Sequence, residues 1–330
     1  MVPVMVLLLS ACQGCAGCFT PNLGQNNSQQ NNNNSSNDDG DAGDDGGGVG
    51  GGTGGLTDPP PCDIPEEEPN DSRSEAQVLP AENWACGFIS QQGDVETFTT
   101  AAADDGWMTV WARGAAFGST ADLQVFLEDL DDNDVRAGQS WMPGSTDALL
   151  TVPVVADSEW LIQVVDEQGT YSDSHEWQLI ATLDKPPVEW DFSEDESAGN
   201  NGIWSGAALE DGDVVYGTLD RNDQDFWTFE VPEGRSQIYV RVHAWNFGSP
   251  ADTQVTLYRP DESVERRKTT GETSYDRDPL INDRTVYEAG TWALKVDLNG
   301  AGGSPLYWYT VEFGLENTPP DTGDAGGAGG

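Results

Sequence analysis

The sequence predicts an all-β protein that contains two tandem copies of one antiparallel β-sandwich module. Two observations lead to this prediction. The stretch FGSTADLQVFL at 117–127 returns as FGSPADTQVTL at 247–257, with eight of eleven positions identical. Within each copy, apolar and polar residues alternate in short runs separated by Gly, Pro, Asp and Asn, and no helical period is sustained over three turns. Such alternation is typical of strands with one buried face, as in antiparallel sandwiches.

Residues 1–11 are expected to form a signal peptide. The apolar run in MVPVMVLLLSAC is too short to cross a bilayer and is followed by small residues. The tetrapeptide LSAC, which ends at Cys12, resembles the lipobox of bacterial lipoproteins, and this implies lipidation of Cys12. No Lys or Arg precedes the apolar run, so a start upstream of Met1 and a plain signal peptide stay open as alternatives.

Two low-complexity segments flank the modules. Residues 12–62 are rich in Asn, Gly and Asp, with runs such as QQNNNNSSN and DDGGGVGGGTGG, and residues 318–330 are rich in Gly. Neither segment has enough apolar surface to offset the entropy of ordering it. We therefore expect a disordered tether behind the lipid anchor and a disordered tail without a second anchor.

The two modules are expected at 63–184 and 185–317. GDVETF (93–98) corresponds to NDQDFW (222–227) at an offset of 129, and EWLIQVVD (159–166) corresponds to TWALKVDL (291–298) at an offset of 132. Insertions in turns explain the growing offset, because loops tolerate added residues and strands do not. Each module has about 120 residues, which is enough for an independent core.

Alternation assigns the faces of individual strands. In ADLQVFLED and SQIYVRVHAW, the residues expected to face the core are Leu123, Val125, Leu127, Ile238, Val240 and Val242, with Tyr239 and Arg241 on the opposite face. The aromatic residues expected in strands and in the core include Trp107, Trp160, Trp177, Trp227, Trp292 and Trp308.

The charge of the chain excludes one class of function. Lys and Arg number 14 against 58 Asp and Glu, which gives a net charge of −44. Such a chain repels nucleic acid and anionic lipid surfaces, so we expect no nucleic-acid partner and membrane contact only through the N-terminal lipid. The cluster of Arg266, Arg267 and Lys268 is expected to be a solvated hairpin.

Four cysteines remain after Cys12, an even number that agrees with disulfides in an oxidising compartment. We favour a Cys62–Cys86 pair, because both residues lie at the start of the first module. Cys15 and Cys18 form a C-x-x-C motif within the tether, where a local disulfide or free thiols are better supported than a redox or metal site.

One family resemblance covers most of the first module. EEEPNDSRSEAQVL (66–79), GDVETF, ADLQVFL and the closing EWLIQVV together resemble the bacterial pre-peptidase C-terminal domain. That family includes the collagen-binding domains of clostridial collagenases. The resemblance implies a jelly-roll-like β-sandwich without catalytic activity, appended to secreted enzymes or repeated in surface proteins. In the second module EDESAGNN (194–201) replaces EEEPND.

The resemblance also implies a calcium site in the first module. Its ligands would be Glu66, Glu68, Asn70, Asp71, Asp94 and Glu96, with Asp223 and Asp225 as weaker candidates in the second module. Ca²⁺ takes roughly six to eight oxygen ligands from carboxylates and carbonyls. The alternative is structural, because Pro-Asn-Asp is also a turn and cap signal and Asp94 would then cap a hairpin.

Other candidate motifs lack support. DLDDNDVRAGQS (129–140) superficially resembles an EF-hand loop but has Asp134 in place of its Gly and Ser140 in place of its last Glu, so we expect a hairpin turn. His175 and His243 lie outside any H-E-x-x-H motif and are expected on strand surfaces. No G-x-S-x-G motif and no phosphate-binding glycine loop is present.

These observations predict an exported, non-catalytic cell-envelope lipoprotein, anchored to the outer membrane and binding an extracellular protein or polysaccharide, with Ca²⁺ as the candidate cofactor. A passive structural spacer is the first alternative, and an unrecognised secreted hydrolase is a distant one. The ligand and the oligomeric state are not encoded in any motif.

Overall fold

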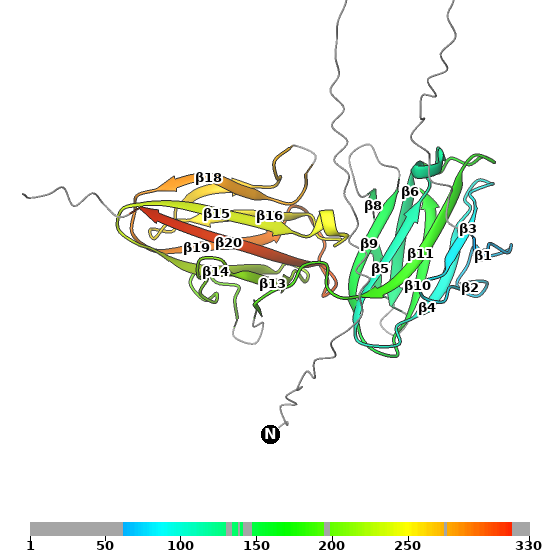
Figure 1. Ribbon diagram of the computed structural model, residues 1–330, viewed down its shortest axis with the longest axis horizontal. Helices are drawn as coiled ribbons and strands as arrows, with labels where there is room; N and C mark the ends of the chain where they lie inside the picture. The colour runs from blue at the N-terminus through cyan, green and yellow to red at the C-terminus, as the bar shows by residue number, and fades with distance from the viewer. Residues whose placement is uncertain are drawn as a thin grey trace, which may run out of the picture. The chain divides into compact units, whose positions relative to one another are not determined.

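The computed structural model describes residues 62–129, 134–137, 139–140, 147–194, 199–273 and 276–318 (Figure 1). These residues belong to Gly54–Gly330, the second of two units into which the chain divides. The described residues do not include the predicted signal peptide, Cys12, Cys15 or Cys18, nor nearly all of the predicted tether and tail.

Two sheets form the first module. The first has the order β1-β3-β11-β5-β9-β8, and the second has the order β2-β4-β10-β6-β7. The strands of the first sheet are β1 (Ile64–Pro65), β3 (Trp84–Phe88), β11 (Glu176–Asp184), β5 (Gly106–Arg113), β9 (Ala148–Val154) and β8 (Gln139–Ser140). Those of the second are β2 (Gln77–Val78), β4 (Glu96–Ala101), β10 (Glu159–Asp166), β6 (Leu123–Asp129) and β7 (Asp134–Ala137).

The second module repeats this plan. One sheet has the order β12-β13-β20-β15-β18, and the other has the order β14-β19-β16-β17. The strands of the first are β12 (Phe192–Ser193), β13 (Val214–Thr218), β20 (Trp308–Thr318), β15 (Arg235–His243) and β18 (Leu280–Val286). Those of the second are β14 (Gln224–Val231), β19 (Gly290–Leu298), β16 (Thr253–Tyr258) and β17 (Val264–Lys268).

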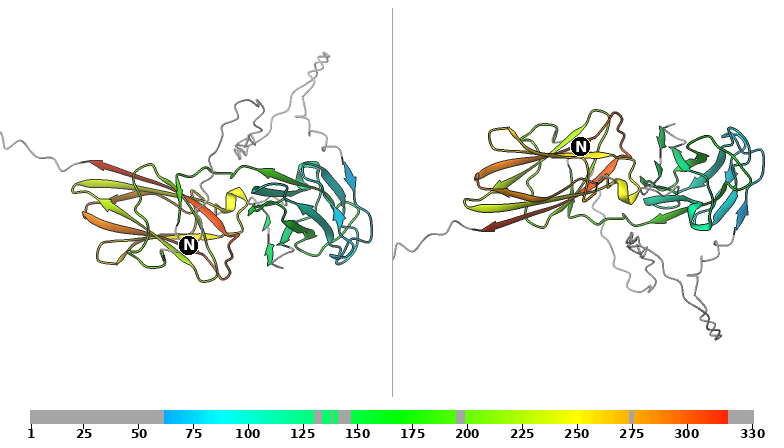
Figure 2. Two further views of the ribbon diagram at one scale, coloured as in Figure 1. Left: turned by 90° about the horizontal axis from the view of Figure 1, so that it is seen from below. Right: turned by 90° about the horizontal axis from the view of Figure 1, so that it is seen from above.

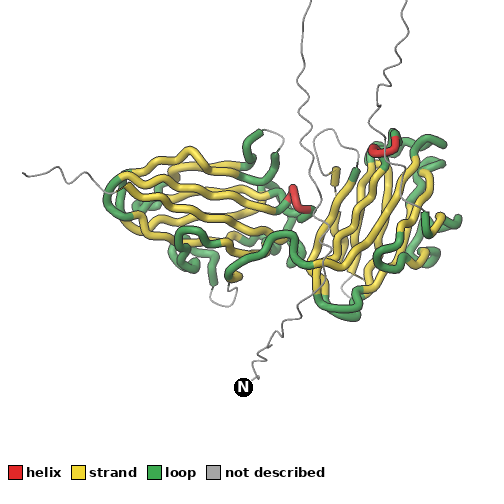
Figure 3. The backbone as a smooth tube through the Cα atoms, in the orientation of Figure 1, coloured by secondary structure: helices red, strands yellow, loops and turns green. Residues whose placement is uncertain are grey.

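The prediction of an all-β sandwich fold is confirmed. Within each module the two sheets face each other, and strands dominate the described chain (Figures 2 and 3). The sheets are antiparallel except at their N-terminal edges, where β1–β3, β2–β4 and β12–β13 are short parallel pairs. Among the described residues, no helix is long and apolar enough to cross a membrane.

Each module has its own apolar core between its sheets. The six inward positions predicted from alternation are fully buried: Leu123, Val125, Leu127, Ile238, Val240 and Val242. Trp160 and Trp177 belong to the first core, and Trp227 and Trp292 belong to the second. Trp107 and Trp308 are also buried but belong to neither core cluster. Each fully buried large apolar side chain contributes about 1.5–3 kcal/mol to folding, which explains the strict alternation.

The duplicated sequence FGS-x-AD builds a tight turn rather than a ligand site. It follows a short 3₁₀ turn, Ala115–Phe117 in the first module and Trp245–Phe247 in the second. Gly118 and Gly248 then adopt φ values of 89° and 86°, a left-handed conformation that side chains disfavour. The glycine at this position is therefore a requirement of the backbone.

An aspartate from a distant loop caps each of these turns. Asp147 Oδ1 accepts hydrogen bonds from the backbone N–H groups of Gly114 and Ala115, at 2.7 and 2.9 Å. Asp278 caps the second turn with both oxygens: Oδ1 accepts from the N–H of Trp245 at 2.8 Å, and Oδ2 accepts from the N–H of Asn246 at 3.1 Å. Because the cap joins segments about 30 residues apart, it fixes the start of β9 or β18 against the 3₁₀ turn.

The structure corrects one expectation about the histidines. His243 ends β15 and is half-buried, with Nε2 3.7 Å from Glu312 Oε2. His175, however, precedes β11 and is buried, with Nδ1 4.0 Å from Asp166 Oδ2, so it is not a strand-surface residue. In the acidic segment at 129–140, where a hairpin turn is expected, β6 and β7 pair Asp129 with Asp134, and residues 130–133 and 138 lie outside the described residues.

Candidate metal centre

Glu66 lies at the edge of the first module, directly after β1. Its backbone N–H donates to Cys86 O at 2.9 Å, and its Oε2 accepts from the backbone N–H of Phe88 at 3.0 Å. A disulfide between Cys62 and Cys86 joins the same two segments, as the sequence suggested, with Cα atoms 5.7 Å apart. The middle of β3 therefore fixes the backbone of Glu66, and its last residue, Phe88, fixes the Glu66 carboxylate.

Asn70 and Glu96 form the buried centre of the site. Both residues have no exposed surface, and Asn70 Nδ2 donates to Glu96 Oε2 at 2.9 Å. Glu96 is the first residue of β4, whereas Asn70 lies in the turn that follows Glu68. The backbone N–H of Asn70 in turn donates to Glu68 Oε2 at 3.1 Å.

Asp71 and Asp94 lie beside this centre and also support the backbone. Asp71 Oδ1 accepts from the backbone N–H of Val95 at 3.1 Å. Asp94 Oδ2 accepts from the N–H groups of Ser90 and Gln91 at 2.7 and 3.2 Å. The capping role considered for Asp94 is therefore present, and it leaves the carboxylate facing the other acids.

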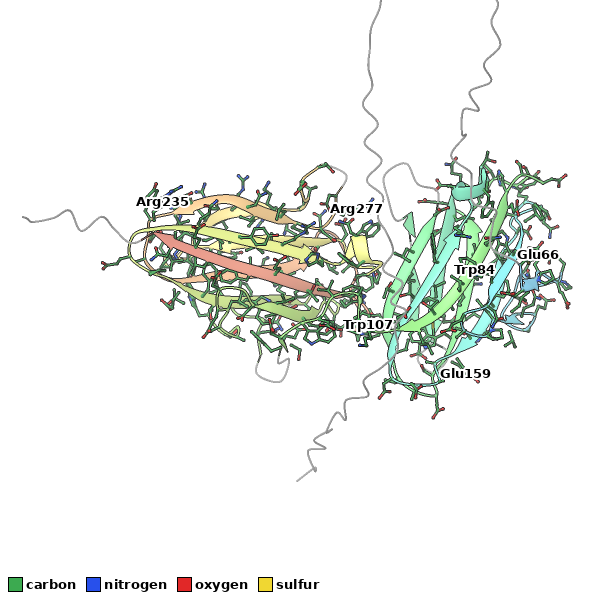
Figure 4. The ribbon with its side chains drawn as sticks, viewed as in Figure 1. Glu66, Trp84, Trp107, Glu159, Arg235 and Arg277 are labelled. Atoms are coloured by element: carbon green, nitrogen blue, oxygen red, sulfur yellow. A yellow bond between two sulfur atoms is a disulfide. The ribbon has the colours of Figure 1, made fainter. Side chains whose placement is uncertain are left out.

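All six residues named for the first module come together. One group with ligand oxygens within 4.8 Å of one another contains Glu66, Glu68 and Glu96, and a second contains Glu68, Asp71 and Asp94. Glu68 belongs to both groups. Figure 4 labels Glu66 at this edge of the module, well apart from the exposed Glu159 at the start of β10.

The electrostatics of this cluster are unfavourable without a counter-charge. Burial, with further repulsion from Glu66 and Asp94, raises the pKa of Glu96 to about 9. Burial also raises the pKa of Glu66 and of Glu68. Asn70 Oδ1 and Glu96 Oε1 are buried and have no hydrogen-bond partner among the described residues. Two oxygen acceptors at the centre are therefore unsatisfied, and each such group costs about 1–3 kcal/mol.

The second module has a corresponding site that the sequence reading located only in part. Asn200 Nδ2 donates to Glu194 Oε2 at 2.9 Å and to Asp225 Oδ1 at 2.8 Å. Glu194 follows β12 as Glu66 follows β1, and its Oε1 accepts from the N–H of Thr218 at 2.5 Å. Burial and the charge of Glu194 raise the pKa of Asp225 to about 10.

Sequence reasoning missed Glu194 and Asn200 as members of this site. Glu66 and Asn70 are four residues apart, whereas Glu194 and Asn200 are six apart, so EDESAGNN does not align with EEEPND without a gap. Asn201 is the residue that could have indicated this alignment, because it corresponds to Asp71. Asn201 Oδ1 accepts from the N–H of Gln224, just as Asp71 Oδ1 accepts from the N–H of Val95. Residues 195–198 lie outside the described residues.

A phenol distinguishes the second site from the first. Tyr309 OH donates to Asp225 Oδ2 at 2.8 Å and accepts from Trp227 Nε1 at 3.2 Å. Tyr309 pairs with Gly217 of β13. In the first module the equivalent glycine, Gly87 of β3, pairs with Trp177, which offers no hydroxyl. Asn200 Oδ1 and Asp223 Oδ2 are still buried without a partner among the described residues. The buried carboxylate of the second site thus has the Tyr309 hydroxyl as a donor in addition to the asparagine amide that each site has.

Both sites present oxygen atoms alone from carboxylates and an amide. Hard cations such as Ca²⁺ prefer such ligands, and a cation would lower the cost of gathering several acids. The first site fits Ca²⁺ better, because it gathers five carboxylates and has the unsatisfied Asn70 Oδ1 at its centre.

No family model matches the sequence, and no curated protein matches it. Among solved structures, the pre-peptidase C-terminal domain of a collagenase from Bacillus anthracis is similar, with 16% identity over 34% of this chain and 94% of that one, and a TM-score of 0.26. A putative secreted protein from Eubacterium rectale matches at 8% identity over 78% of this chain and 86% of that one, with a TM-score of 0.23.

A third similar structure is the CBM22-1–CBM22-2 tandem domain of Xyn10C from Paenibacillus barcinonensis. It matches at 13% identity over 70% of this chain and 85% of that one, with a TM-score of 0.20. Scores and identities this low carry no argument about function, which must come from the side chains themselves.

Proposed function

We propose that this chain is an exported, non-catalytic cell-envelope protein whose first module binds Ca²⁺ and whose two modules bind an extracellular polymer, a protein or a polysaccharide. The observation that carries the calcium proposal is the pair of unsatisfied buried oxygens, Asn70 Oδ1 and Glu96 Oε1, within a cluster of acids. A cation bound there would satisfy both oxygens and offset the repulsion that raises the pKa of Glu96.

Two features support the rest of the proposal. The Cys62–Cys86 disulfide agrees with an oxidising compartment, and therefore with export. Two modules on one chain would add avidity toward a repetitive polymer if both engage it at once. The second site is proposed as a weaker cation site, because Tyr309 already donates to Asp225.

Thermal unfolding of the full chain tests the calcium proposal. A ligand that binds only the folded state, at a hundred times its Kd, adds about 2.7 kcal/mol of stability. We expect millimolar Ca²⁺ to raise the Tm, a chelator to reverse the rise, and the Glu68→Ala/Asp94→Ala double variant to abolish it. Glu159→Gln, which removes an exposed acid elsewhere in the same module, is the matched control and should keep the full rise.

Equal melting curves with calcium and with chelator would contradict the calcium proposal. The acids of the first module would then be a structural cluster that shares protons instead of a cation. The spacer alternative would gain support if, in addition, neither module bound a polymer.

A further inference from the structure

The outer face of the β18-β15-β20 layer in the second module contains a hollow of about 270 Å³. Its lining residues are Asp211, Gln237, Tyr239, Asn282, Gly314, Leu315 and Glu316. It lies just below the size of pockets for drug-sized ligands, roughly 300–1,000 Å³. The hollow therefore has room for one ring of a ligand and no room for a large cofactor.

Gly314 creates this hollow. A Cβ atom at this position would lie 3.3 Å from Tyr239 Cβ and 3.7 Å from Asp211 Oδ1. A side chain on Gly314 would thus occupy the space between the tyrosine and the aspartate. Because β20 contributes no side chain at this point, one flank of the half-buried Tyr239 stays open to a ligand.

An irregularity in β18 widens the hollow on the other side of Tyr239. Ile238 pairs with Arg284 and Val240 pairs with Ile281, so that two residues of β18 fall opposite Tyr239. One of these residues is Asn282, whose side chain lines the hollow. Bulges of this kind re-aim side chains and are frequent next to binding sites.

The corresponding position of the first module carries different residues. Thr182 and Thr109 pair there, in the positions that Gly314 and Tyr239 hold in the second module. The Thr109 hydroxyl lies 3.2 Å from the hydroxyl of Thr151. Small threonines that contact one another replace the tyrosine, the glycine and the bulge. The residues that line the hollow therefore differ between the two copies of the module.

The lining combines one aromatic ring with polar groups of mixed character. The side chains of Gln237, Tyr239, Asn282 and Glu316 make no hydrogen bond or ion pair within the described part of the chain, whereas Asp211 Oδ1 accepts from Leu315 N at 2.7 Å. Amides both donate and accept, and carboxylates accept. A sugar ring matches this set, because its C–H face packs on an aromatic ring and its hydroxyls donate and accept.

We propose that this hollow binds one saccharide unit of an extracellular polysaccharide, with Tyr239 as the stacking residue and Gln237, Asn282 and Glu316 as hydroxyl partners. The polymer, which the proposed function leaves open between a protein and a polysaccharide, is here a polysaccharide. This inference rests on the proposed polymer binding and does not depend on calcium. The lysine or arginine side chain of a partner protein is disfavoured, because it would use only the acceptors and leave both amide NH₂ groups without partners.

Calorimetric titration of the full chain with soluble oligosaccharides of glucose, of xylose and of N-acetylglucosamine tests the proposal. We expect at least one series to bind, and Tyr239→Ala to weaken that binding at least about tenfold, which corresponds to about 1.4 kcal/mol. Gly314→Thr introduces the residue of the first module and should weaken binding as much, by filling the hollow. Thr109→Ala, at the position equivalent to Tyr239, is the matched control and should leave binding unchanged.

Asn282→Ala changes an exposed side chain and serves as a second variant if Gly314→Thr lowers the Tm. Binding that persists in Tyr239→Ala and Asn282→Ala would overturn the proposal, as would the failure of all three oligosaccharide series to bind. Binding of a lysine- or arginine-rich peptide that requires Tyr239, with no saccharide bound, would also overturn it in favour of a protein partner. Saccharide binding that survives a chelator would uphold this site even where the calcium test fails.

Discussion

At the scale of single residues, Glu96 shows how a buried acid indicates a site. Its side chain has no exposed surface, and it accepts a hydrogen bond from Asn70 Nδ2 at 2.9 Å. A glutamate that only capped a turn would gain more from exposure than from burial. The cation proposed for this site would compensate the charge of the buried carboxylate.

The pH dependence of stability follows from the raised pKa of Glu96. Its carboxyl binds a proton up to a pH of about 9 in the folded state but only up to about 4.5 when unfolded. The folded state thus holds more protons between these values, and the free energy of unfolding falls as pH rises, by at most about 1.4 kcal/mol per pH unit from this group. Without calcium, we expect urea denaturation at pH 5, 7 and 9 to show this decline.

Glu96→Gln should flatten the decline, because an isosteric amide cannot titrate and keeps an oxygen for Asn70 Nδ2. Asp225, with a pKa raised to about 10, contributes a similar decline from the second module, so part of the slope should remain. Saturating calcium should flatten the wild-type curve as well. A slope that is identical in the wild type and in Glu96→Gln would contradict the assignment of the buried charge to Glu96.

At the scale of elements, the 3₁₀ turns and their aspartate caps join distant parts of each module. Asp278 is almost fully buried, and the two N–H groups of Trp245 and Asn246 depend on it. Asp278→Ala would leave both groups without an acceptor, at about 1–3 kcal/mol for each. We expect urea denaturation to show a loss of stability of this order.

Asp278→Asn retains only one of the two acceptor oxygens and should therefore recover only part of the lost stability. Asp147→Ala in the first module should cost less, because Asp147 is only half-buried and water can replace its oxygen. If Asp278→Ala and Asp147→Ala had no effect, the turns would have to be stabilised by their glycines and core contacts alone.

The elements themselves were largely predictable, because alternation depends on local sequence. The inward faces of β6 and β15 follow directly from ADLQVFLED and SQIYVRVHAW. The second site was predictable only in part, since a loop longer by two residues shifts Asn200 away from the position that EEEPND suggests. In the sequence, Tyr309 cannot be distinguished from an aromatic residue that only packs in the core. Its contact with Asp225 depends on strand pairing between segments 84 residues apart.

The hollow beside Tyr239 was not predictable for a related reason. Tyr239, Asn282 and Gly314 lie on three strands, and their convergence depends on a register shift in β18. Register is set by cross-strand packing, which a single sequence does not display. The predicted outward position of Tyr239 is confirmed, but its surroundings required the structure.

At the scale of the whole molecule, the anchor and tether that the sequence predicts would determine what the modules can reach. A lipidated Cys12 followed by a flexible segment to Cys62 would allow the modules to search the space around the membrane, with an end-to-end distance of about 5–6 Å times the square root of the number of residues. For some fifty residues this is on the order of 40 Å. Polymer binding near the surface of the cell would then be favoured over binding at a distance.

Lipidation of Cys12 is the prediction on which this arrangement depends. In an expressing bacterium supplied with a labelled fatty acid, the wild-type chain should acquire the label and partition into detergent, because stable anchoring requires more than one acyl chain. Cys12→Ser removes the acceptor thiol and should yield an unlabelled chain in the aqueous phase, while Cys15→Ser, three residues later, should behave as the wild type. Label that persists in Cys12→Ser would place the lipid elsewhere, and an unlabelled wild type would favour a plain signal peptide and a freely diffusing protein.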